Sequence, residues 1–585
     1  MSESGHSIWG GDAMADVQHF DAVIVGSGFG GSVAAFRLAA DGQRILVLER
    51  GKAYPPGSFA RTPREMHVNF WDPSAGLHGM FDLWSFRGLE AVVSSGLGGG
   101  SLIYANVLLR KDERWFVVKD PVRGGYETWP ITRADLEPHY DEVEAMLGAQ
   151  RFPFGESGYE AVAKTAAMQG AARDLGHEWQ LPPLAVSFSP SPGERAVPGE
   201  PIREADYPNI HRRSRQTCRL CGECDVGCNY GSKNTLDHTY LSAAAHHGAE
   251  IRTRCEVRSF APRAGGGYSV GFVEHAAERE GKRTNTGKLP ITTVTCDRLI
   301  LAAGTLGSPY LLLRNRSAFA GISRALGTRF CGNGDLLSFA LKATDRNGGA
   351  GRVLNPSRGP VITSAIRVPD AVDGGRGRGF YIQDAGYPGF VDWMLEATTV
   401  GSTAVRVARF ALRRLWARLS RDPKSMLGAE ISQLIGNTHL SSGSLPLLGM
   451  GRDVPDGVMS LSKGYLAIDW TTKTSQKYFD RVTSTMADIA HAMGGRFEEN
   501  PLSHLKRVIT VHPLGGCPMG DTDKEGVVDA YGQVFGYPDL YVLDGSVMPG
   551  PVGANPSLTI AAFADRAVCH MIESRPHDRK GRVRT

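Results

Sequence analysis

The sequence predicts an α/β fold with a Rossmann-like dinucleotide-binding domain and at least one further structural unit. The first observation is a short apolar stretch, residues 20–25, which runs directly into a glycine-rich turn at residues 26–31. The second is that glycine-rich loops recur near residues 98 and 304, far apart in the chain. The third is the length of 585 residues, which exceeds the size at which a single hydrophobic core stops growing.

The composition is that of a globular protein and excludes several other classes. Hydrophobic residues make up 42% of the chain and charged residues 22%, and 72 glycines indicate many tight turns. The net charge of +4 is small for this length and no nucleic-acid-binding motif is present, so we expect no nucleic-acid partner. The sequence shows no secretion signal and no stretch near the roughly 18 apolar residues of a spanning helix. We therefore expect a cytoplasmic protein with at most peripheral membrane contact.

Residues 20–49 predict a strand, a turn, a helix and a second strand. Residues 20–25 (FDAVIV) and 44–48 have the apolar character of buried parallel strands, and residues 32–40 between them predict a helix. In such a unit Gly26 permits the tight turn, Gly28 lets the backbone approach a pyrophosphate, and Gly31 allows the helix to pack closely on the strand. The N-terminus of the helix would bind the phosphates, and Glu49 would accept hydrogen bonds from an adenosine ribose.

The two other glycine-rich loops favour FAD over a nicotinamide cofactor. One covers residues 93–106 (VSSGLGGGSLIYAN), and the other covers residues 300–309 (ILAAGTLGSP) and begins in an apolar strand. Glycines lack a Cβ atom and therefore let the main chain lie against a large flat ligand. A nicotinamide cofactor would not need three such loops, so the sequence predicts FAD.

Five ordered motifs of the chain resemble those of the glucose-methanol-choline (GMC) family of flavoprotein oxidoreductases, and most of all its cholesterol oxidase-like branch. The motifs are residues 26–31, 98–106, 303–309 (AGTLGSP) and 512–517 (HPLGGC), and residues 543–549 (LDGSVMP) together with 555–560 (NPSLTI). The resemblance extends over nearly the whole length. It implies an FAD-binding domain interleaved with a discontinuous α+β substrate domain built on an antiparallel sheet.

The resemblance also implies domain limits and residue roles. The FAD-binding domain would comprise residues 18–115, 231–335 and 501–575, and the substrate domain residues 116–230 and 336–500. The residues implied to bind FAD are Gly26, Gly28, Gly31 and Glu49 at its ADP half, Gly100, Ser101 and Asn106 along the isoalloxazine, Asp544 and Gly545 near the ribityl and pyrophosphate, and Gly304 in the third motif. His512 and Asn555 match the family's catalytic pair. Other members have histidine at the second position, so Asn555 points toward the sterol-oxidising members.

The chemistry of alcohol oxidation agrees with this pair. Removal of a hydride from an alcohol becomes easier as the hydroxyl loses its proton, and histidine is the side chain that titrates near neutrality. A neutral asparagine can donate a hydrogen bond to the developing alkoxide. We therefore expect His512 to act as the base and Asn555 to stabilise the oxygen, with hydride transfer to flavin N5.

A cysteine-rich loop, residues 218–228, has the C-x2-C-x2-C-x3-C spacing of bacterial ferredoxin ligands at Cys218, Cys221, Cys224 and Cys228. Asn229 follows the last cysteine, where ferredoxins usually have proline. In ferredoxins with two clusters the fourth cysteine ligates the other cluster, so the spacing alone does not assign four ligands to one site. Three alternatives stay open: structural thiols, free or partly in disulfides; an iron-sulfur cluster; or zinc, whose cysteine pairs are usually spaced further apart.

Two segments of the expected substrate domain carry structural predictions. Residues 464–470 (GYLAIDW) alternate in hydropathy and predict a strand of the antiparallel sheet over the flavin. Residues 399–421 predict an amphipathic helix with one arginine-rich side. That helix is either an ordinary surface helix with a solvated basic face, or a helix that lies on an anionic bilayer or acts as a lid over a lipid-sized pocket.

Taken together, the sequence predicts FAD-dependent oxidation of a small hydrophobic alcohol, of the sterol or long-chain lipid type, with oxygen or another electron acceptor. One rival is a flavoprotein dehydrogenase that passes electrons through a cluster at the four cysteines to a quinone or a protein. A second rival is a catalytically silent flavin- or lipid-binding protein, which the presence of both His512 and Asn555 disfavours.

Overall fold

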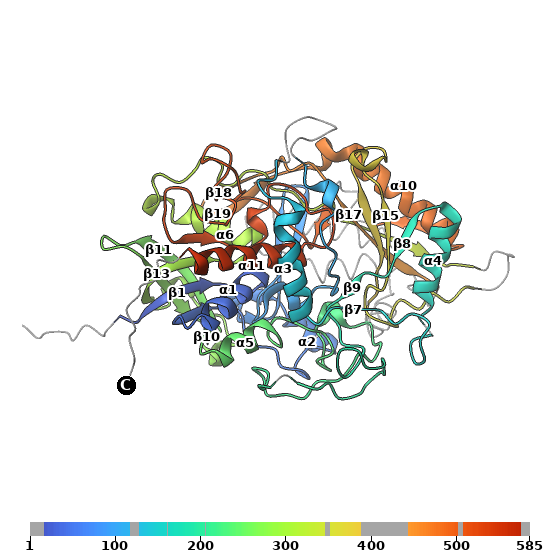
Figure 1. Ribbon diagram of the computed structural model, residues 1–585, viewed down its shortest axis with the longest axis horizontal. Coiled ribbons are helices and arrows are strands. Elements are labelled where there is room, and N and C mark those ends of the chain that lie inside the picture. The colour runs from blue at the N-terminus through green and yellow to red at the C-terminus, as the bar shows by residue number, and fades with distance from the viewer. Residues whose placement is uncertain are drawn as a thin grey trace, which may run out of the picture.

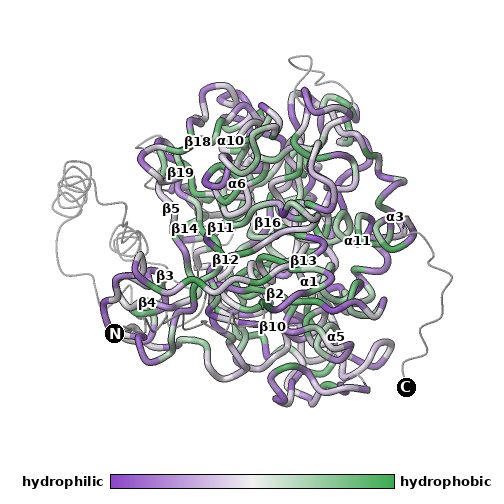
Figure 2. Tube along the Cα trace, turned by 90° about the vertical axis from the view of Figure 1, so that its left-hand side faces the viewer, coloured by the Kyte–Doolittle hydropathy of each residue, from purple (hydrophilic) through white to green (hydrophobic). Residues whose placement is uncertain are grey.

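The structure is a computed structural model that describes residues 17–117, 128–160, 162–204, 206–344, 351–387, 443–500 and 507–574. Two large sheets lie side by side in it (Figure 1). One contains β1 (His19–Val25) and β13 (Thr292–Leu301), and the other contains β15 (Ala365–Val368) and β17 (Leu445–Gly451). Figure 2 shows hydrophobic segments along the central strands and hydrophilic segments in the outer loops.

The first sheet has a parallel core, as residues 20–49 predict. Its order is β10-β2-β1-β13-β12-β11, and β22 pairs with the C-terminal end of β13 while β12 pairs with the N-terminal end. The strands β10, β2, β1, β13 and β22 are parallel. Parallel strands need crossover connections, which are usually helical. The other strands are β2 (Ile45–Leu48), β10 (Glu250–Arg252), β11 (Cys255–Pro262), β12 (Tyr268–Glu274) and β22 (Leu540–Val542).

Helix α1 (Phe29–Ala40) follows the glycine-rich turn, and eight of its twelve residues are buried. It packs against α5 (Tyr240–His246) and α11 (Ser557–Glu573), and α11 packs in turn against α3 (Arg133–Met146). Its small residues explain the close approach, since Ala34, Ala35 and Ala39 leave room for the neighbouring helices. The apolar strands, buried on both faces, provide the rest of this core.

The second sheet is antiparallel throughout, in the order β20-β14-β17-β16-β15-β8. Helices α10 (Gln476–Ala492) and α4 (Ala163–Leu175) pack on it and on each other, at the right of Figure 1. The remaining strands are β8 (Glu178–Gln180), β14 (Leu336–Leu341), β16 (Phe380–Asp384) and β20 (Arg496–Glu499). The predicted fold class is therefore confirmed: a dinucleotide-binding α/β unit is interleaved with an α+β unit on an antiparallel sheet.

The strand expected at residues 464–470 forms, but not in that sheet. It is β19 (Tyr465–Asp469), which forms a two-stranded hairpin with β18 (Val458–Ser462), and its Asp469 also forms an isolated bridge with Arg87. Tyr465 and Val458 are exposed, and the buried face of the hairpin packs on α6 (Gly304–Arg314), where the Tyr310 hydroxyl donates to Gly464 O at 3.1 Å. Alternating hydropathy predicted the strand correctly but could not specify its partner.

The smaller elements join the two units. A three-stranded sheet, β21-β6-β5, carries the segment that leads to residue 512. The elements not yet named are α2 (Pro63–His67), β3 (Trp71–Asp72), β4 (Leu77–His78), β5 (Phe81–Phe86), β6 (Leu89–Ser94), β7 (Gln150–Arg151), β9 (Pro183–Leu184) and β21 (Val508–Thr510).

Every strand of the first large sheet falls within residues 18–115, 231–335 and 501–575, and every strand of the second within residues 116–230 and 336–500. The exact domain limits stay a prediction.

The amphipathic segment at residues 399–421 lies outside the described residues, so its role as a surface helix or a lid stays a prediction. Among the helices of the described ranges, none combines the length and the hydropathy needed to cross a membrane.

Gly30 offers a test of the packing between α1 and the end of β22. A Cβ atom there would lie 1.6 Å from the main-chain oxygen of Leu543, which cannot move without disrupting the sheet. We expect Gly30→Ala to cost about 3 kcal/mol of stability, the upper range for overpacking. Gly170→Ala is the matched control, because nothing lies within 4 Å of its Cβ position in α4, and it should stabilise by about 0.5 to 1 kcal/mol. Urea unfolding of both variants measures the difference, and equal stabilities would contradict this packing.

Candidate active site

The glycine-rich turn after β1 is pressed against the end of β13. Gly26 has φ 98°, and a Cβ atom there would lie 2.4 Å from Ala302 O. A Cβ atom at Gly31 would lie 2.1 Å from Gly26 O. Neither position therefore has room for a side chain, as the sequence analysis expects of a tight turn and of a close approach of helix and strand.

Glu49 holds this turn from the end of β2. Its Oε2 atom accepts hydrogen bonds from the Ser27 N–H at 3.1 Å and from the Ser27 hydroxyl at 2.7 Å, and its Oε1 atom accepts from the Gly51 N–H at 2.8 Å. The carboxylate is almost fully buried. Glu49 thus lies beside the phosphate-binding turn, and the hydrogen bond to a ribose stays a prediction.

Gly28 occupies open space at the start of α1. No protein atom lies within 4 Å of the position of its missing Cβ, and α1 has no side-chain cap and no acidic residue in its first turn. The second glycine-rich loop touches the first here, since a Cβ at Gly99 would lie 2.7 Å from Gly28 Cα and the Gly98 N–H donates to Ser27 Oγ at 3.0 Å. Uncapped N–H groups beside unfilled space form a site suited to a pyrophosphate.

After the open turn at Gly28, the side chain of Asn106 is a second feature that shows whether FAD fits this site. Its backbone is left-handed, with φ 69°, and its side chain is fully buried, yet neither amide atom has a hydrogen-bond partner in the described residues. A buried amide without partners costs free energy unless a ligand satisfies it. An isoalloxazine ring, which offers carbonyl oxygens and ring nitrogens, would satisfy this amide.

The other residues of this loop are placed differently. Gly100 is exposed, at a short 3-10 helix over Gly99–Leu102. The Ser101 hydroxyl donates to Gly98 O at 2.7 Å and accepts from the Leu236 N–H at 3.1 Å. Both hydrogen bonds of the Ser101 hydroxyl are made within the protein, so this side chain stabilises the loop. A contact between the main chain of Ser101 and the isoalloxazine ring stays a prediction.

Asp544 binds the start of α6. Its Oδ2 atom accepts from the Gly304 N–H at 2.9 Å and the Ser308 hydroxyl at 2.5 Å, and its Oδ1 atom accepts from the Ser546 N–H and hydroxyl. Burial raises the pKa of Asp544, against the lowering effect of these hydrogen bonds. Nothing lies within 4 Å of the Cβ position of Gly304, whereas a Cβ at Gly545 would lie 2.6 Å from Thr305 Oγ1. Gly304 and Asp544 therefore come together, and Gly304 faces the open side.

His512 is held by Asp335, a residue that the sequence analysis did not identify. Its Nδ1 atom lies 2.8 Å from Asp335 Oδ1, and its side chain is 15% exposed. Asp335 is 1% exposed, and its Oδ2 atom accepts from the N–H groups of Val511 and His512 and from the Thr510 hydroxyl. A carboxylate with these donors accepts from Nδ1–H, which leaves Nε2 as the basic atom of the ring.

Asn555 is held by Gln383 on β16, also missed by sequence analysis. Its Oδ1 atom accepts from Gln383 Nε2 at 2.7 Å, and its Nδ2 atom lies 3.4 Å from Gln383 Oε1. This pairing orients the Asn555 amide so that one N–H stays available to a ligand. Both side chains are buried, and Asn555 lies just before α11.

One turn joins the segments that carry His512 and Asn555. Asn333 binds the second segment, because its Nδ2 atom donates to Ala554 O and its Oδ1 atom accepts from the Gly553 N–H, each at 2.9 Å. Asp335, two residues later, binds the first segment. Asn333 and Gly334 are both left-handed, with φ 53° and 66°. The G-N-G-D sequence of residues 332–335 was the signal that could have indicated this turn.

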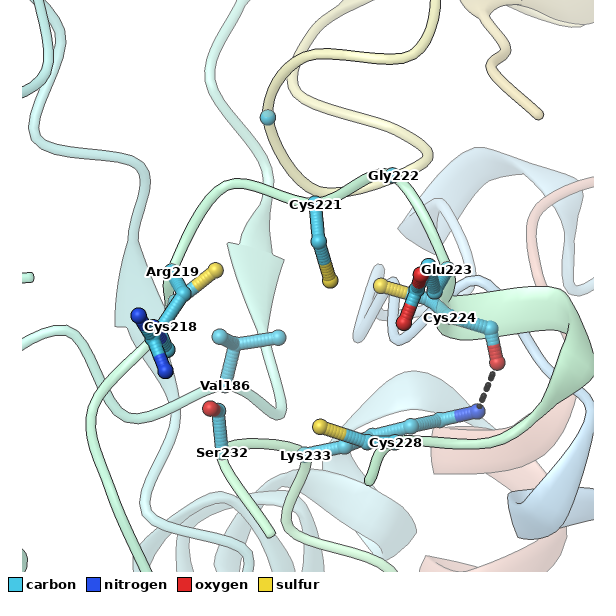
Figure 3. Close-up of a pocket in the computed structure, with 11 residues that line it drawn as sticks. Val186, Cys218, Arg219, Cys221, Gly222, Glu223, Cys224, Cys228, Ser232 and Lys233 are labelled. Carbon is cyan, nitrogen blue, oxygen red and sulfur yellow. Dashed lines mark hydrogen bonds between the residues drawn. The ribbon is translucent and has the colours of Figure 1, made fainter. Parts of the chain in front are cut away.

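The four cysteines of the 218–228 loop surround one small cavity with Lys233 at its edge (Figure 3). All nine cysteines of the chain are free in the structure. Burial, followed by the nearby Cys224 thiol, raises the pKa values of Cys218 and Cys221. Burial also lowers the pKa of Lys233 to about 8, although Cys224 opposes this shift.

Comparisons with known proteins agree with this geometry. Family models described as GMC oxidoreductase match residues 20–331 and 465–564. A cholesterol oxidase of Mycobacterium tuberculosis is 30% identical over 571 residues, which are 94% of this chain and 90% of that protein. A long-chain-alcohol oxidase of Arabidopsis thaliana is 23% identical, and the match covers 94% of this chain and 68% of that protein.

A solved structure shares the fold. The crystal structure of pyridoxine 4-oxidase from Mesorbium loti matches with a TM-score of 0.53 and 17% identity, over 95% of this chain and 100% of that chain. The open turn at Gly28 and the amide of Asn106, which has no partner among the described residues, fit FAD. The chain therefore belongs to the GMC oxidoreductase family and is an FAD-dependent oxidoreductase that acts on CH–OH donors.

Proposed function

We propose that this enzyme oxidises a hydrophobic alcohol, of the sterol or long-chain lipid type, with His512 as the base and Asn555 as the hydrogen-bond donor to the reacting oxygen. The observation that carries the proposal is the fixed ring of His512, with Nδ1 bound to buried Asp335 and the ring still partly accessible. A base must face the substrate hydroxyl in the correct tautomer, and Asp335 supports that arrangement.

In the proposed reaction, Nε2 of His512 accepts the proton of the substrate hydroxyl. Asp335 stabilises the positive charge that develops on the imidazole, and the free N–H of Asn555 donates to the alkoxide oxygen. Gln383 keeps that amide from rotating. Bound FAD supplies the hydride acceptor. The residues proposed to hold it are Gly26, Gly28, Gly31, Glu49, Gly100, Ser101, Asn106, Gly304, Asp544 and Gly545.

The relatives support the substrate class. Two of them are named for cholesterol and for long-chain alcohols, both apolar molecules with one hydroxyl group. They are also named oxidases, which supports oxygen as an acceptor for this chain. The silent flavin- or lipid-binding alternative is disfavoured, because a non-catalytic protein has no need of a histidine held in one tautomer by a buried carboxylate.

His512→Ala tests the base. We expect the variant to keep bound flavin and its fold but to lose roughly 10² to 10⁴ in turnover, the usual size of a general-base contribution. His491→Ala, an exposed histidine in the last turn of α10, is the control and should turn over at the wild-type rate. Turnover is measured at the flavin absorption band with a panel of sterols and long-chain alcohols. Full activity in His512→Ala would remove this residue from the mechanism.

Asp335→Asn tests the positioning of the ring. The amide N–H₂ would face Nδ1 and favour the opposite tautomer, in which Nε2 carries the proton and cannot accept another. We expect turnover to fall by roughly 10² or more, with flavin content and melting temperature close to those of the wild type. A variant that instead loses flavin or unfolds early, with normal turnover per bound flavin, would show that Asp335 has only a structural role.

Gly28→Val tests the phosphate turn. The protein alone has open space at this position, so the valine should fit the apoprotein but block the approach of a pyrophosphate. We expect a folded, colourless protein. Gly265→Val, in the exposed turn between β11 and β12, is the control, since its Cβ position is also open. Flavin content after denaturation measures the outcome, and a yellow, active Gly28→Val would contradict the assignment.

A further inference from the structure

The four cysteines of the 218–228 loop point into one shared space. Figure 3 shows the sulfur atoms of Cys218, Cys221, Cys224 and Cys228 turned toward the same cavity, with Val186 and Ser232 also on its wall. In ferredoxins with two clusters, the fourth cysteine of this spacing serves a different cluster. Here the fold turns the fourth cysteine toward the other three, which the sequence spacing could not establish.

The backbone holds this arrangement in place. Leu220, which is left-handed with φ 59°, lies between the first two cysteines, and its carbonyl accepts from the Gly359 N–H at 3.1 Å. The Gly222 N–H donates to Gly359 O at 2.9 Å, and the Cys218 N–H donates to Ser187 O at 2.9 Å. A leucine in the left-handed region is strained, and such strain persists only where the surroundings impose it. The loop is therefore built around the cavity by contacts with two other segments.

The spacing of the sulfur atoms distinguishes between the possible occupants. A tetrahedral zinc ion binds thiolates at about 2.3 Å and so brings their sulfur atoms to within roughly 4 Å of one another. No three of these four described sulfur atoms lie within 4.8 Å of one another, and none of the four is in a disulfide. A cubane cluster places iron and sulfide between its thiolates and holds them further apart than a single ion does. The sulfur atoms are therefore too far apart for one zinc ion or for disulfides in this structure, and their spacing is compatible with a cluster.

A buried cation lies beside the cavity. The Lys233 ammonium donates to Cys224 O at 2.8 Å, and Lys233 and Arg219 both line the space. Four thiolates around an oxidised four-iron core carry a net charge of about −2. A buried negative charge needs a partner, and Lys233 provides one.

From these observations we propose that Cys218, Cys221, Cys224 and Cys228 ligate a single [4Fe–4S] cluster. This site lies outside the alcohol-binding and flavin-binding residues assigned above. It rests on the sulfur positions, the backbone hydrogen bonds that hold the loop and the buried cation, and not on the function of the flavin.

The position of the cluster site suits electron transfer from the flavin, an inference that rests on the proposed function. Lys233 Nζ also donates to Leu102 O at 3.0 Å, and its ammonium lies 4.8 Å from the centre of the Tyr104 ring. Leu102 and Tyr104 belong to the loop that we assign to the isoalloxazine. The cluster would therefore lie one side chain from the loop assigned to the isoalloxazine, and would relay electrons from the flavin bound there.

The electron balance is simple. Oxidation of one alcohol to a carbonyl compound releases two electrons and two protons. Each electron would reduce the [4Fe–4S] core from charge +2 to +1 in turn, and an external one-electron oxidant would reoxidise the core each time. The protons pass to solvent. Two such cycles return the flavin to its oxidised state.

Metal and sulfide analysis of the full-length protein tests the site. The protein is expressed with iron and cysteine supplied, purified without oxygen and reconstituted with iron and sulfide. We expect about four iron atoms and about four acid-labile sulfides per chain, with an electron paramagnetic resonance signal after reduction by dithionite. Less than one iron per chain, or stoichiometric zinc, would overturn the proposal. This measurement on the wild type decides the site even where a variant fails to fold.

Cys221→Ala and Cys569→Ser form the matched pair of variants. Cys221→Ala should lose at least about one iron per chain together with the wild-type resonance signal, whereas Cys569→Ser, a cysteine of α11 outside the loop, should keep both. Retention of all the iron with an unchanged signal in Cys221→Ala would refute its assignment as a ligand.

The relay is tested with ferricenium as a one-electron oxidant. After anaerobic reduction of the flavin by an alcohol, reoxidation by ferricenium should be slower in Cys221→Ala than in Cys569→Ser, and equal rates would refute the relay. Failure of the alcohol to bleach the flavin of the wild type would reject the proposed function instead. The cluster site would still be tested in that case, because iron and sulfide content are measured without any alcohol.

Discussion

The turn at residues 332–335 is the constraint on which the candidate active site depends. Asp335 accepts hydrogen bonds from the ring and the backbone of His512, and Asn333 binds the backbone at Gly553 and Ala554, immediately before Asn555. Cys331, next to this turn, exchanges backbone hydrogen bonds with Leu514. Four consecutive positions thus set the relation between the segments of His512 and Asn555, which are 43 residues apart in the chain, and a shift of the turn would displace both.

Buried carboxylates elsewhere in the fold have a similar task. Glu49 binds the backbone and hydroxyl of the phosphate turn, and Asp544 binds the first N–H and Ser308 of α6. Each lies where a parallel strand ends and a ligand-binding loop begins, which is where open α/β sheets gather their ligands. Because these oxygens satisfy backbone groups of the protein, the loops are held in shape before a cofactor binds, and preorganisation of this kind lowers the cost of binding.

The cysteine loop lies beside the loop of residues 93–106, although its residues 218–228 belong to the predicted substrate domain. Lys233 connects the two sites, because its ammonium binds Cys224 O on one side and Leu102 O on the other. Lys233 has carbonyl acceptors, and the thiols of Cys224 and Cys228 and the carboxylates of Asp225 and Asp237 also act on its ammonium. A buried ammonium is costly unless negative charge compensates it. A metal-bound set of thiolates supplies that charge, and this links the cluster proposed here to the loop assigned to the flavin.

The sequence by itself determined the dinucleotide-binding unit and the FAD preference, and it singled out His512, Asn555 and the four cysteines as candidates, because glycine turns, strand periodicity and ligand spacing are local properties of the chain. Only the tertiary structure decided which groups support them. Asp335 and Gln383 reach their partners from 177 and 172 residues away, and no local pattern encodes such a pairing. For the same reason β19 was recognised as a strand but assigned to the wrong sheet, since alternation specifies a buried face and not the element that covers it. Likewise, the spacing of the cysteines was readable from the chain, but their convergence on one cavity depends on contacts with residues 187 and 359.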